Sequence, residues 1–213
     1  MPQPFRKSQV REFFESICVA VILAFFVRTF VVQAFKIPTG SMENNLLIGD
    51  HLLVNKFVFA PTLTSIEKAL LPIDPIRRGD ILVFKFPEDP TRDFIKRVIG
   101  LPGETIEMRN KKVYIDGTPL DEPYVHFLDP PSDEGGSSAP DADVSDLRSG
   151  FPPMMVPPDQ YFMMGDNRDN SQDSRYWGFM RRDYVKGKAL FVYFSFGDGL
   201  ANLRWSRLLH QLH

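Results

Sequence analysis

A lysine inside a predicted strand is the first residue of this sequence that is suited to acid–base chemistry. Lys96 lies in the segment FIKRVI (94–99), where successive side chains point to opposite faces of a strand. Neither face is purely polar, so Lys96 or its neighbour Arg97 must be held against apolar side chains. Burial lowers the pKa of a lysine, and a neutral lysine can act as a general base. On this segment alone, a lysine whose stem lies along an edge strand is the simpler interpretation.

A serine in a glycine-containing turn offers a nucleophile. The segment IPTGSM (37–42) follows an apolar stretch, and its proline and glycine predict a turn. Gly40 would let the backbone approach a substrate closely. The Ser41 hydroxyl could attack a carbonyl carbon if a base lay nearby, and its backbone N–H with the Thr39 hydroxyl could hold the oxyanion. Taken alone, the segment is more simply an ordinary turn that contains a serine.

A dense polar run, GDNRDNSQDSR (165–175), lies between two methionines and an aromatic pair. Carboxylates and arginines this close together can pair and stiffen a loop. Alternating Asp and Asn side chains are also possible calcium ligands. The EF-hand pattern needs a central glycine and a terminal glutamate, and both are missing here. The run therefore predicts a structural polar loop and no metal site.

Other hydrolytic centres find little support in the sequence. A Ser-His-Asp triad needs an oriented histidine, and the four histidines lie in contexts without evident partners: His51, His126, His210 and His213. No HExxH or comparable zinc pattern is present. The single cysteine, Cys18, lies in the most apolar stretch, where we expect a small buried side chain rather than a reactive thiolate. We expect no metal and no organic cofactor.

The composition predicts a β-rich fold beyond the amino terminus. Among 213 residues, 19 phenylalanines and 18 prolines suit strands joined by turns. The strands are predicted at 81–84, 94–99, 105–108, 112–115, 161–164 and 189–194, with a hairpin at 110–111 and a short helix compatible with 64–71. The formal net charge of −2 gives no sign of the basic face that nucleic-acid binding usually requires.

Residues 13–32 are expected to form a transmembrane anchor, whose end the sequence leaves between residues 27 and 35. The run 17–27 is apolar, and roughly 20 helical residues cross a bilayer. Three basic residues precede it, Arg6, Lys7 and Arg11, so the positive-inside rule assigns residues 1–12 to the cytoplasm. A cleaved secretory signal would need small residues after the apolar run, where bulky ones stand. A buried core helix is the remaining alternative.

Residues 129–150 differ in composition from the rest of the chain. They contain six acidic residues, no basic residue before Arg148, and the run GGSSAP. Such a segment predicts a solvated, mobile insertion rather than part of a core. An acidic functional tail is the alternative interpretation.

Taken together and in this order, these segments resemble those of bacterial type I signal peptidases, or leader peptidases, which are serine proteases with a Ser/Lys dyad. The resemblance covers the anchor and then IPTGSM (37–42), LIGDHLLVNK (47–56), RGDILVFKFPEDP (78–90), DFIKRVIGLPGE (93–104) and GDNRDNSQDSRYWG (165–178). It spans nearly the whole chain apart from residues 121–160. The last two motifs are the most specific.

The resemblance implies a role for each matching residue. Ser41 matches the nucleophile of the family, and Lys96 matches its general base. Thr39 stands where relatives often have serine as the side-chain oxyanion donor, and threonine keeps the hydroxyl. Ser171 matches a serine that orients the lysine amine. A supporting ion pair is matched by Asp173 and Arg175. Shallow apolar S1 and S3 pockets, which select small residues before the cut, are matched by Phe35, Ile37, Met42, Leu46, Leu52, Val83, Phe94 and Ile95.

The family likeness also implies a fold, a reaction and a location. The implied fold is a mainly antiparallel β domain over residues 33–213, with an inserted smaller β region, preceded by one transmembrane helix that ends near Val27. The implied reaction removes signal peptides from exported preproteins after Ala-x-Ala. We expect a monomer in the bacterial inner membrane, near the secretion translocon, in contact with lipid and with no nucleic acid. The catalytic domain is expected outside the cytoplasm.

Two alternatives remain at this point. A self-cleaving repressor-type protease uses a similar Ser/Lys pair, but it would need a DNA-binding module and no membrane span. A membrane-anchored β-rich binding or assembly protein, whose polar loop is purely structural, would show no activity on a signal-peptide substrate.

Overall fold

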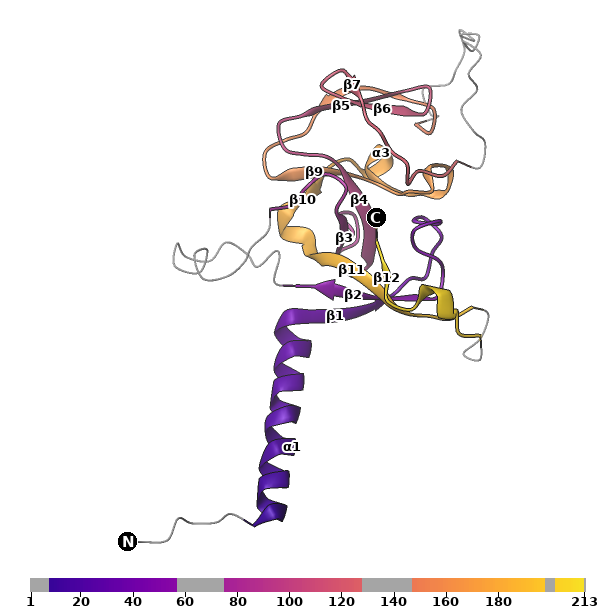
Figure 1. Cartoon of the computed structure of the whole chain (residues 1–213). Coiled ribbons are helices and arrows are strands. Elements are labelled where there is room, and N and C mark those ends of the chain that lie inside the picture. Colours follow the sequence, from indigo (N-terminus) through magenta and orange to yellow (C-terminus); the bar gives the residue numbers. More distant parts are fainter. Residues whose placement is uncertain (1–7, 57–74, 128–146, 198–201, 213) are drawn as a thin grey trace.

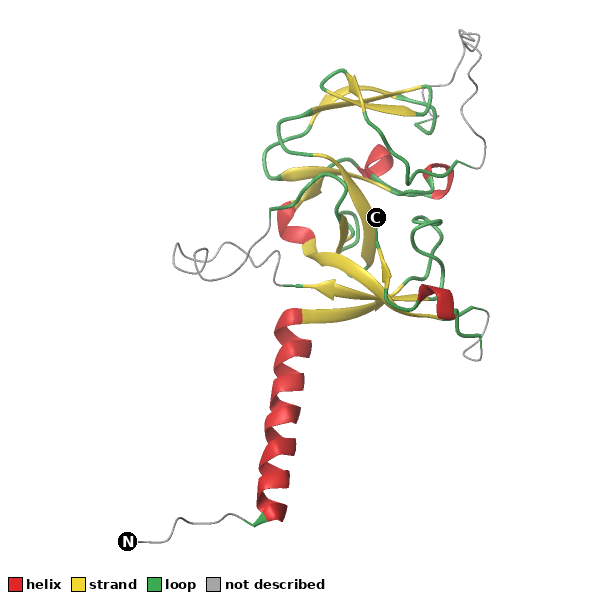
Figure 2. Ribbon diagram, in the orientation of Figure 1, coloured by secondary structure: helices red, strands yellow, loops and turns green. Residues whose placement is uncertain are grey.

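The protein consists of one long helix and two antiparallel sheets, and the computed structural model describes residues 8–56, 75–127, 147–197 and 202–212 (Figures 1 and 2). Helix α1 (Gln9–Phe26) projects away from the sheets, and none of its residues is buried. A π-helical turn (Val27–Val31) follows it and leads directly into strand β1 (Val32–Lys36). The apolar helix is therefore joined to the first strand without a loop.

The helical segment Gln9–Val31 has 23 residues and is long and apolar enough to cross a membrane. At about 1.5 Å per residue it extends over about 35 Å, against roughly 30 Å for a hydrocarbon core. The helix begins before the apolar run because the Ser8 side chain caps it, accepting a hydrogen bond from the Arg11 N–H (3.3 Å). Its α-helical part ends at Phe26. The range 27–35, within which the sequence left the end of the anchor, is occupied by the π-helical turn and most of β1.

The larger sheet has eight strands and forms the body of the molecule. Its spatial order is β1, β2 (Asp50–Asn55), β11 (Val185–Ser195), β3 (Ile81–Lys85), β4 (Asp93–Gly100), β9 (Gln160–Met164) and β10 (Met180–Arg181), and β12 (His210–Gln211) pairs with β11. Every pairing in it is antiparallel. Adjacent central strands thereby bring together residues that lie far apart in the sequence.

The smaller sheet has four strands and lies at the end of the molecule opposite α1 (Figure 1). Its order is β7 (Thr118–Pro119), β6 (Lys112–Ile115), β5 (Thr105–Arg109) and β8 (Phe151–Met155). The predicted hairpin turn has positive φ at Asn110 (50°) and Lys111 (62°), as a type I′ turn requires. All four strands lie between β4 and β9 in sequence, so this sheet is an insertion into the larger one.

Three apolar clusters hold the sheets together. One packs the β1–β2 connection against β2, β3 and β11, with Met42, Leu46 and Leu52 fully buried. A second lies around Leu82, Phe84 and Met163, with Trp177 packed against it. The third joins the two sheets through β5, β6, β8 and β9. The described residues also form the short helical elements η3 (Arg168–Asn170), α3 (Ser174–Trp177), η4 (Arg182–Tyr184) and η5 (Trp205–Arg207).

The prediction of a mainly antiparallel β fold with an amino-terminal apolar helix is confirmed, and each strand predicted from the sequence is present. The compatible helix at 64–71 and most of the acidic insertion at 129–150 lie outside the described residues.

Candidate active site

The loop between β1 and β2 carries Ser41 on a tight turn. The Glu43 N–H donates to the Gly40 carbonyl (3.1 Å), and the Leu46 N–H donates to the Met42 carbonyl (2.8 Å). Met42 and Leu46 are fully buried, so the loop is anchored by its own apolar side chains. Ser41 is itself 7% exposed. The sequence therefore holds this hydroxyl at the edge of the core rather than on a free surface turn.

Strand β4 brings Lys96 to the same point, 55 residues further along the chain. Its Nζ donates to Ser41 Oγ (2.6 Å) and to the Ile95 carbonyl (3.1 Å). The lysine is 4% exposed. Arg97, the neighbour that points to the opposite face of the strand, is 2% exposed. Both cations of the predicted strand are thus buried, and Lys96 is the one that meets a hydroxyl.

Burial changes the proton affinity of Lys96. Loss of hydration lowers its pKa from 10.5 to about 8, and the positive charge of Arg175 acts in the same direction. The carboxylates of Asp173 and Asp166 oppose this shift. The result is an amine that exchanges its proton close to neutral pH while hydrogen-bonded to a serine hydroxyl. This pairing can deprotonate a nucleophile.

The polar run 165–175 forms a loop that is braced internally. Arg175 donates from Nε to Asp173 Oδ1 (2.8 Å) and from Nη2 to Asp173 Oδ2 (2.9 Å), and both side chains are fully buried. The Gly165 N–H donates to the same carboxylate (3.0 Å). Although burial alone would raise the pKa of Asp173, its hydrogen bonds and the charge of Arg175 hold the pKa below the usual range. The predicted ion pair is therefore formed.

Ser171 lies beside the pair but is not hydrogen-bonded to Lys96. Within the described residues the Ser171 hydroxyl is buried without a hydrogen-bond partner, although it is close enough to Asp173 to help lower that carboxyl's pKa. Gly165 separates it from the nucleophile loop. A β-carbon on Gly165 would lie 2.5 Å from the Ser41 carbonyl oxygen and 2.6 Å from Ser171 Cβ. Only glycine allows the two segments to approach this closely.

Two further contacts of the loop were not singled out by the sequence reasoning. Arg97 makes a buried two-point ion pair with Asp166 (2.8 and 2.7 Å), and its guanidinium lies 3.9 Å from the centre of the Tyr124 ring. Asn167 donates from its backbone to the Ser41 carbonyl (3.2 Å) and from Nδ2 to the Gly40 carbonyl (3.3 Å). The density of polar residues at 165–168 indicated that they would form hydrogen bonds or ion pairs. Local periodicity could not show which distant residue each of them would contact.

The residues expected to line apolar pockets lie mostly below the surface. Six of them are buried members of one core cluster, and Phe35 packs against it: Ile37, Met42, Leu46, Leu52, Val83 and Ile95. Phe94 instead packs against the second cluster, with its ring stacked on Phe86 (centroids 4.2 Å apart). Thr39 is exposed. The Phe94 ring nevertheless lies with its centre 5.4 Å from Lys96 Nζ, so this residue also lies beside the dyad.

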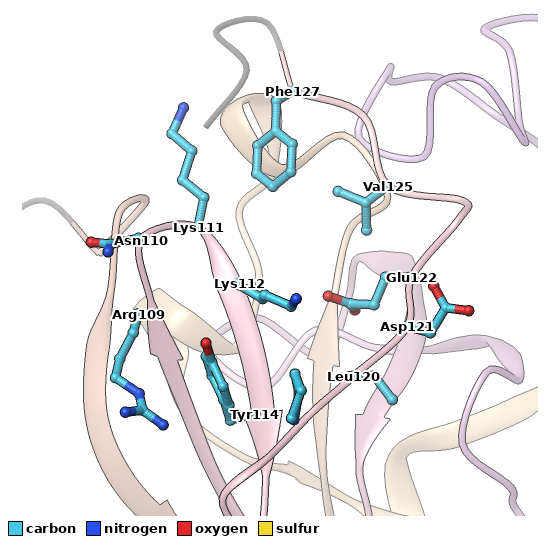
Figure 3. Close-up of a pocket in the computed structure, with 11 residues that line it drawn as sticks. Arg109, Asn110, Lys111, Lys112, Tyr114, Leu120, Asp121, Glu122, Val125 and Phe127 are labelled. Atoms are coloured by element: carbon cyan, nitrogen blue, oxygen red, sulfur yellow. The ribbon is translucent and has the colours of Figure 1, made fainter. Parts of the chain in front are cut away.

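A separate cavity of about 850 Å³ lies over the smaller sheet (Figure 3). It is lined by Arg109, Asn110, Lys111, Lys112, Tyr114, Pro119, Leu120, Asp121, Glu122, Val125 and Phe127. None of the predicted site residues lines it. A smaller cavity of about 350 Å³ includes Ser171 in its wall. In the part of the chain that the structure describes, no group of three or more His, Cys, Asp or Glu side chains is arranged to hold a metal ion.

Comparisons with known proteins define the class to which this chain belongs. The model of the family "Signal peptidase, peptidase S26" matches residues 10–194. A signal peptidase I from Pseudomonas aeruginosa is 34% identical over 92% of this chain and 75% of its own length. A probable signal peptidase I-1 from Synechocystis is 36% identical over 98% of this chain and 90% of its own length. The crystal structure of a signal peptidase I from Enterococcus faecalis, 33% identical, covers 54% of this chain and 97% of its own, with a TM-score of 0.42.

The family model and the two sequence relatives show that the protein is a serine endopeptidase. The chain belongs to the signal peptidase family, peptidase S26, and its function is that of a bacterial type I signal peptidase. A non-catalytic anchored binding protein is not favoured by any of these findings.

Proposed function

We propose that this enzyme cleaves preproteins with Ser41 as the nucleophile and Lys96 as the general base. The observation that carries the proposal is the 2.6 Å hydrogen bond between Lys96 Nζ and Ser41 Oγ inside a buried site. Neutral Lys96 takes the hydroxyl proton as Oγ attacks the carbonyl carbon of the last residue of the signal peptide. The lysine then gives a proton to the leaving amine of the mature protein. Water, deprotonated by Lys96, hydrolyses the acyl-enzyme and releases the signal peptide.

The lowered pKa makes this cycle workable near neutral pH. With a pKa of about 8, roughly one Lys96 in ten is neutral at pH 7, compared with fewer than one in a thousand at the ordinary value. The same group can then act as acid in one step and base in the next. A fully charged lysine could not accept the Ser41 proton.

The developing negative charge on the carbonyl oxygen needs two donors. We assign them to the backbone N–H of Ser41 and the hydroxyl of Thr39. Thr39 is exposed beside the nucleophile, so its hydroxyl is accessible to a substrate. The removal of one such donor typically lowers kcat by about 100- to 1000-fold. The oxyanion assignment therefore makes Thr39 a catalytic residue rather than a spacer in the turn.

Ser171 is proposed to orient the Lys96 amine once substrate is bound. Hydrogen bonds of catalytic groups are often incomplete before substrate binds, and the unsatisfied Ser171 hydroxyl is available for such a bond. Asp173 and Arg175 are proposed to hold this part of the loop in place. Small residues before the cut would lie against the apolar cluster around Ile37 and Ile95, beside the nucleophile.

The substrates proposed are signal peptides of exported preproteins with small residues before the cut. The protein is proposed to sit in the bacterial inner membrane with α1 as a single span, its amino terminus in the cytoplasm and both sheets outside. An anchored enzyme and an anchored substrate share one surface, which shortens the search between them. We further propose that the protein is monomeric and works near the secretion translocon.

Contact with lipid is also proposed for the carboxyl-terminal tail. Trp205 and Leu209 are 73% and 67% exposed, and Leu208 is exposed beside them. Exposed apolar residues of this kind favour an interfacial position. In the variant Trp177→Phe, which leaves Trp205 as the single tryptophan, lipids with brominated acyl chains should quench its fluorescence after reconstitution. Unquenched emission in these vesicles would refute the contact.

The proposal for the dyad is tested by cleavage of a preprotein that has Ala-x-Ala before its mature start, in detergent. Wild type should cut after the second alanine of that motif. Ser41→Ala and Lys96→Ala, each verified to be folded by circular dichroism, should be inactive. Near-normal cleavage by Lys96→Ala would show that another residue is the base. Inactive wild type on several such substrates would contradict the proposed substrate class.

A further inference from the structure

A carboxylate lies next to the proposed nucleophile and belongs to no step of the mechanism. Glu43 closes the turn that carries Ser41, since its N–H donates to the Gly40 carbonyl (3.1 Å). Its side chain folds back over that turn, so that a β-carbon on Gly40 would lie 3.0 Å from Glu43 Oε2. The carboxylate therefore lies beside the residue that directly precedes Ser41.

The charge of Glu43 is not balanced locally. Its side-chain hydrogen bond comes from a neutral group, the Nδ2 of Asn167 (3.3 Å), and in the described part of the chain no cation lies within ion-pair distance. Glu43 is also exposed, in contrast to the buried amide that contacts it. The other carboxylates of this region, Asp166 and Asp173, are each paired with an arginine. A negative charge thus remains unpaired at the edge of the site.

A substrate bound for attack by Ser41 must approach the turn that also holds Glu43. The reacting carbonyl carbon has to lie about 3 Å from Ser41 Oγ for attack. Residues before the cut are proposed to lie against the apolar cluster that includes Ile37. The first residue after the cut has no such pocket assigned to it. Because it is bonded to the carbonyl group that Ser41 attacks, its side chain would lie near the turn that holds Glu43.

We propose that Glu43 is a specificity-determining residue, which favours a basic side chain and disfavours an acidic one at the first position after the scissile bond. The inference rests on the proposed role of Ser41. Because Glu43 is exposed, solvent weakens its interactions, and one attractive or repulsive pair of this kind changes a rate by about threefold. A substrate with lysine at this position should therefore be cleaved about tenfold faster than one with aspartate.

The test uses three preproteins that differ only in the first residue of the mature part: lysine, alanine or aspartate. The quantity measured is kcat/KM for each, in full-length enzyme in detergent at low salt. Wild type should follow the order lysine, alanine, aspartate. Glu43→Gln keeps an oxygen that can accept the Asn167 hydrogen bond, and it should bring the lysine-to-aspartate ratio close to one. Glu43→Lys should invert the order.

The control is Asp183→Asn, which removes an exposed carboxylate just after β10, at the opposite edge of the large sheet from β1. It should leave the lysine-to-aspartate ratio as in wild type. In about 1 M salt, where charges are screened beyond about 3 Å, the wild-type ratio should shrink.

The outcomes separate this inference from the proposed function. An unchanged ratio in Glu43→Gln and Glu43→Lys refutes the role of Glu43, while cleavage itself still supports the Ser/Lys mechanism. An equal shift in Asp183→Asn would mean that net charge, and not position, sets the preference, which also refutes it. The absence of cleavage of all three substrates by wild type would instead contradict the proposed substrate class.

Discussion

Replacement of Lys96 by methionine should abolish activity and yet stabilise the folded protein. Methionine fills a similar volume without a charge, so the variant removes the burial penalty that lowers the pKa from 10.5 to about 8. At about 1.36 kcal/mol per pKa unit, that penalty amounts to about 3 kcal/mol at pH 7. Loss of the hydrogen bond to Ser41 destabilises the variant by about 1 kcal/mol and offsets part of this gain. A net gain of about 2 kcal/mol in the free energy of unfolding is expected.

The pH dependence gives the sharper signature. Between pH 8 and 10.5 the unfolded lysine binds more protons than the folded one. Wild-type stability should therefore rise with pH across this window through Lys96, and the penalty is fully present below pH 8. Methionine has no such dependence. The advantage of Lys96→Met should be constant well below pH 8 and should disappear by about pH 10.5, where the folded-state lysine is neutral and the unfolded-state lysine is half neutral.

The assay is urea unfolding in mild detergent at pH 7 and pH 10.5, read as the difference between variant and wild type so that other titrations cancel. Lys188→Met is the matched control, since Lys188 is a partly exposed lysine of the same sheet that pairs with Asp80 (2.5 Å). It should not stabilise the protein at pH 7. The same pKa predicts that wild-type kcat/KM falls about tenfold per pH unit below pH 8. An identical stability difference at both pH values would refute the reasoning.

Three further substitutions probe the surroundings of the dyad. Asp173→Asn leaves a fully buried arginine unpaired and should cost about 3–5 kcal/mol in urea unfolding, whereas Asp183→Asn, at an exposed pair, should cost about 1 kcal/mol or less. Gly165→Ala should strongly reduce cleavage because its β-carbon would meet the Ser41 carbonyl at 2.5 Å; Gly117→Ala, in open space at φ 77°, should only lower thermal stability slightly. Thr39→Val should reduce kcat by about 100- to 1000-fold and Thr39→Ser should retain it, and equal rates for both would remove Thr39 from the oxyanion site.

Much of the fold could be predicted because its central strands have a clear local pattern. The buried strand β3 is a continuous apolar run, and the turn at Asn110 and Lys111 suits the positive φ values that it adopts. Strand β1 was harder to delimit, since residues 29–35 are as suitable for a strand as for the end of the helix. Strand β8 was missed because it begins Phe151-Pro152-Pro153, and prolines are tolerated only at an edge such as this one.

The individual segments of the site could be picked out from the sequence, but the contacts between their side chains could not. Alternation along 94–99 implied at least one buried cation. Both Lys96 and Arg97 are buried, the second because Asp166 supplies a partner from 69 residues away. Local periodicity has no information on such long-range pairs. The Ser41–Lys96 pairing rested on the family likeness for the same reason. The unsatisfied hydroxyl of Ser171 depends on side-chain geometry that no sequence pattern specifies.

Helix α1 passes through the π-helical turn directly into β1, so no flexible loop separates the proposed membrane span from the strand that leads to the active site. The five residues of β1 extend over about 17 Å. Lys56 braces the junction, with its N–H donating to the Val31 carbonyl and its Nζ to the Thr29 carbonyl (2.9 Å each). With α1 in the bilayer as proposed, Ser41 is held at a nearly constant height above the lipid surface. A scissile bond would then be selected by its distance from the membrane as well as by its flanking residues.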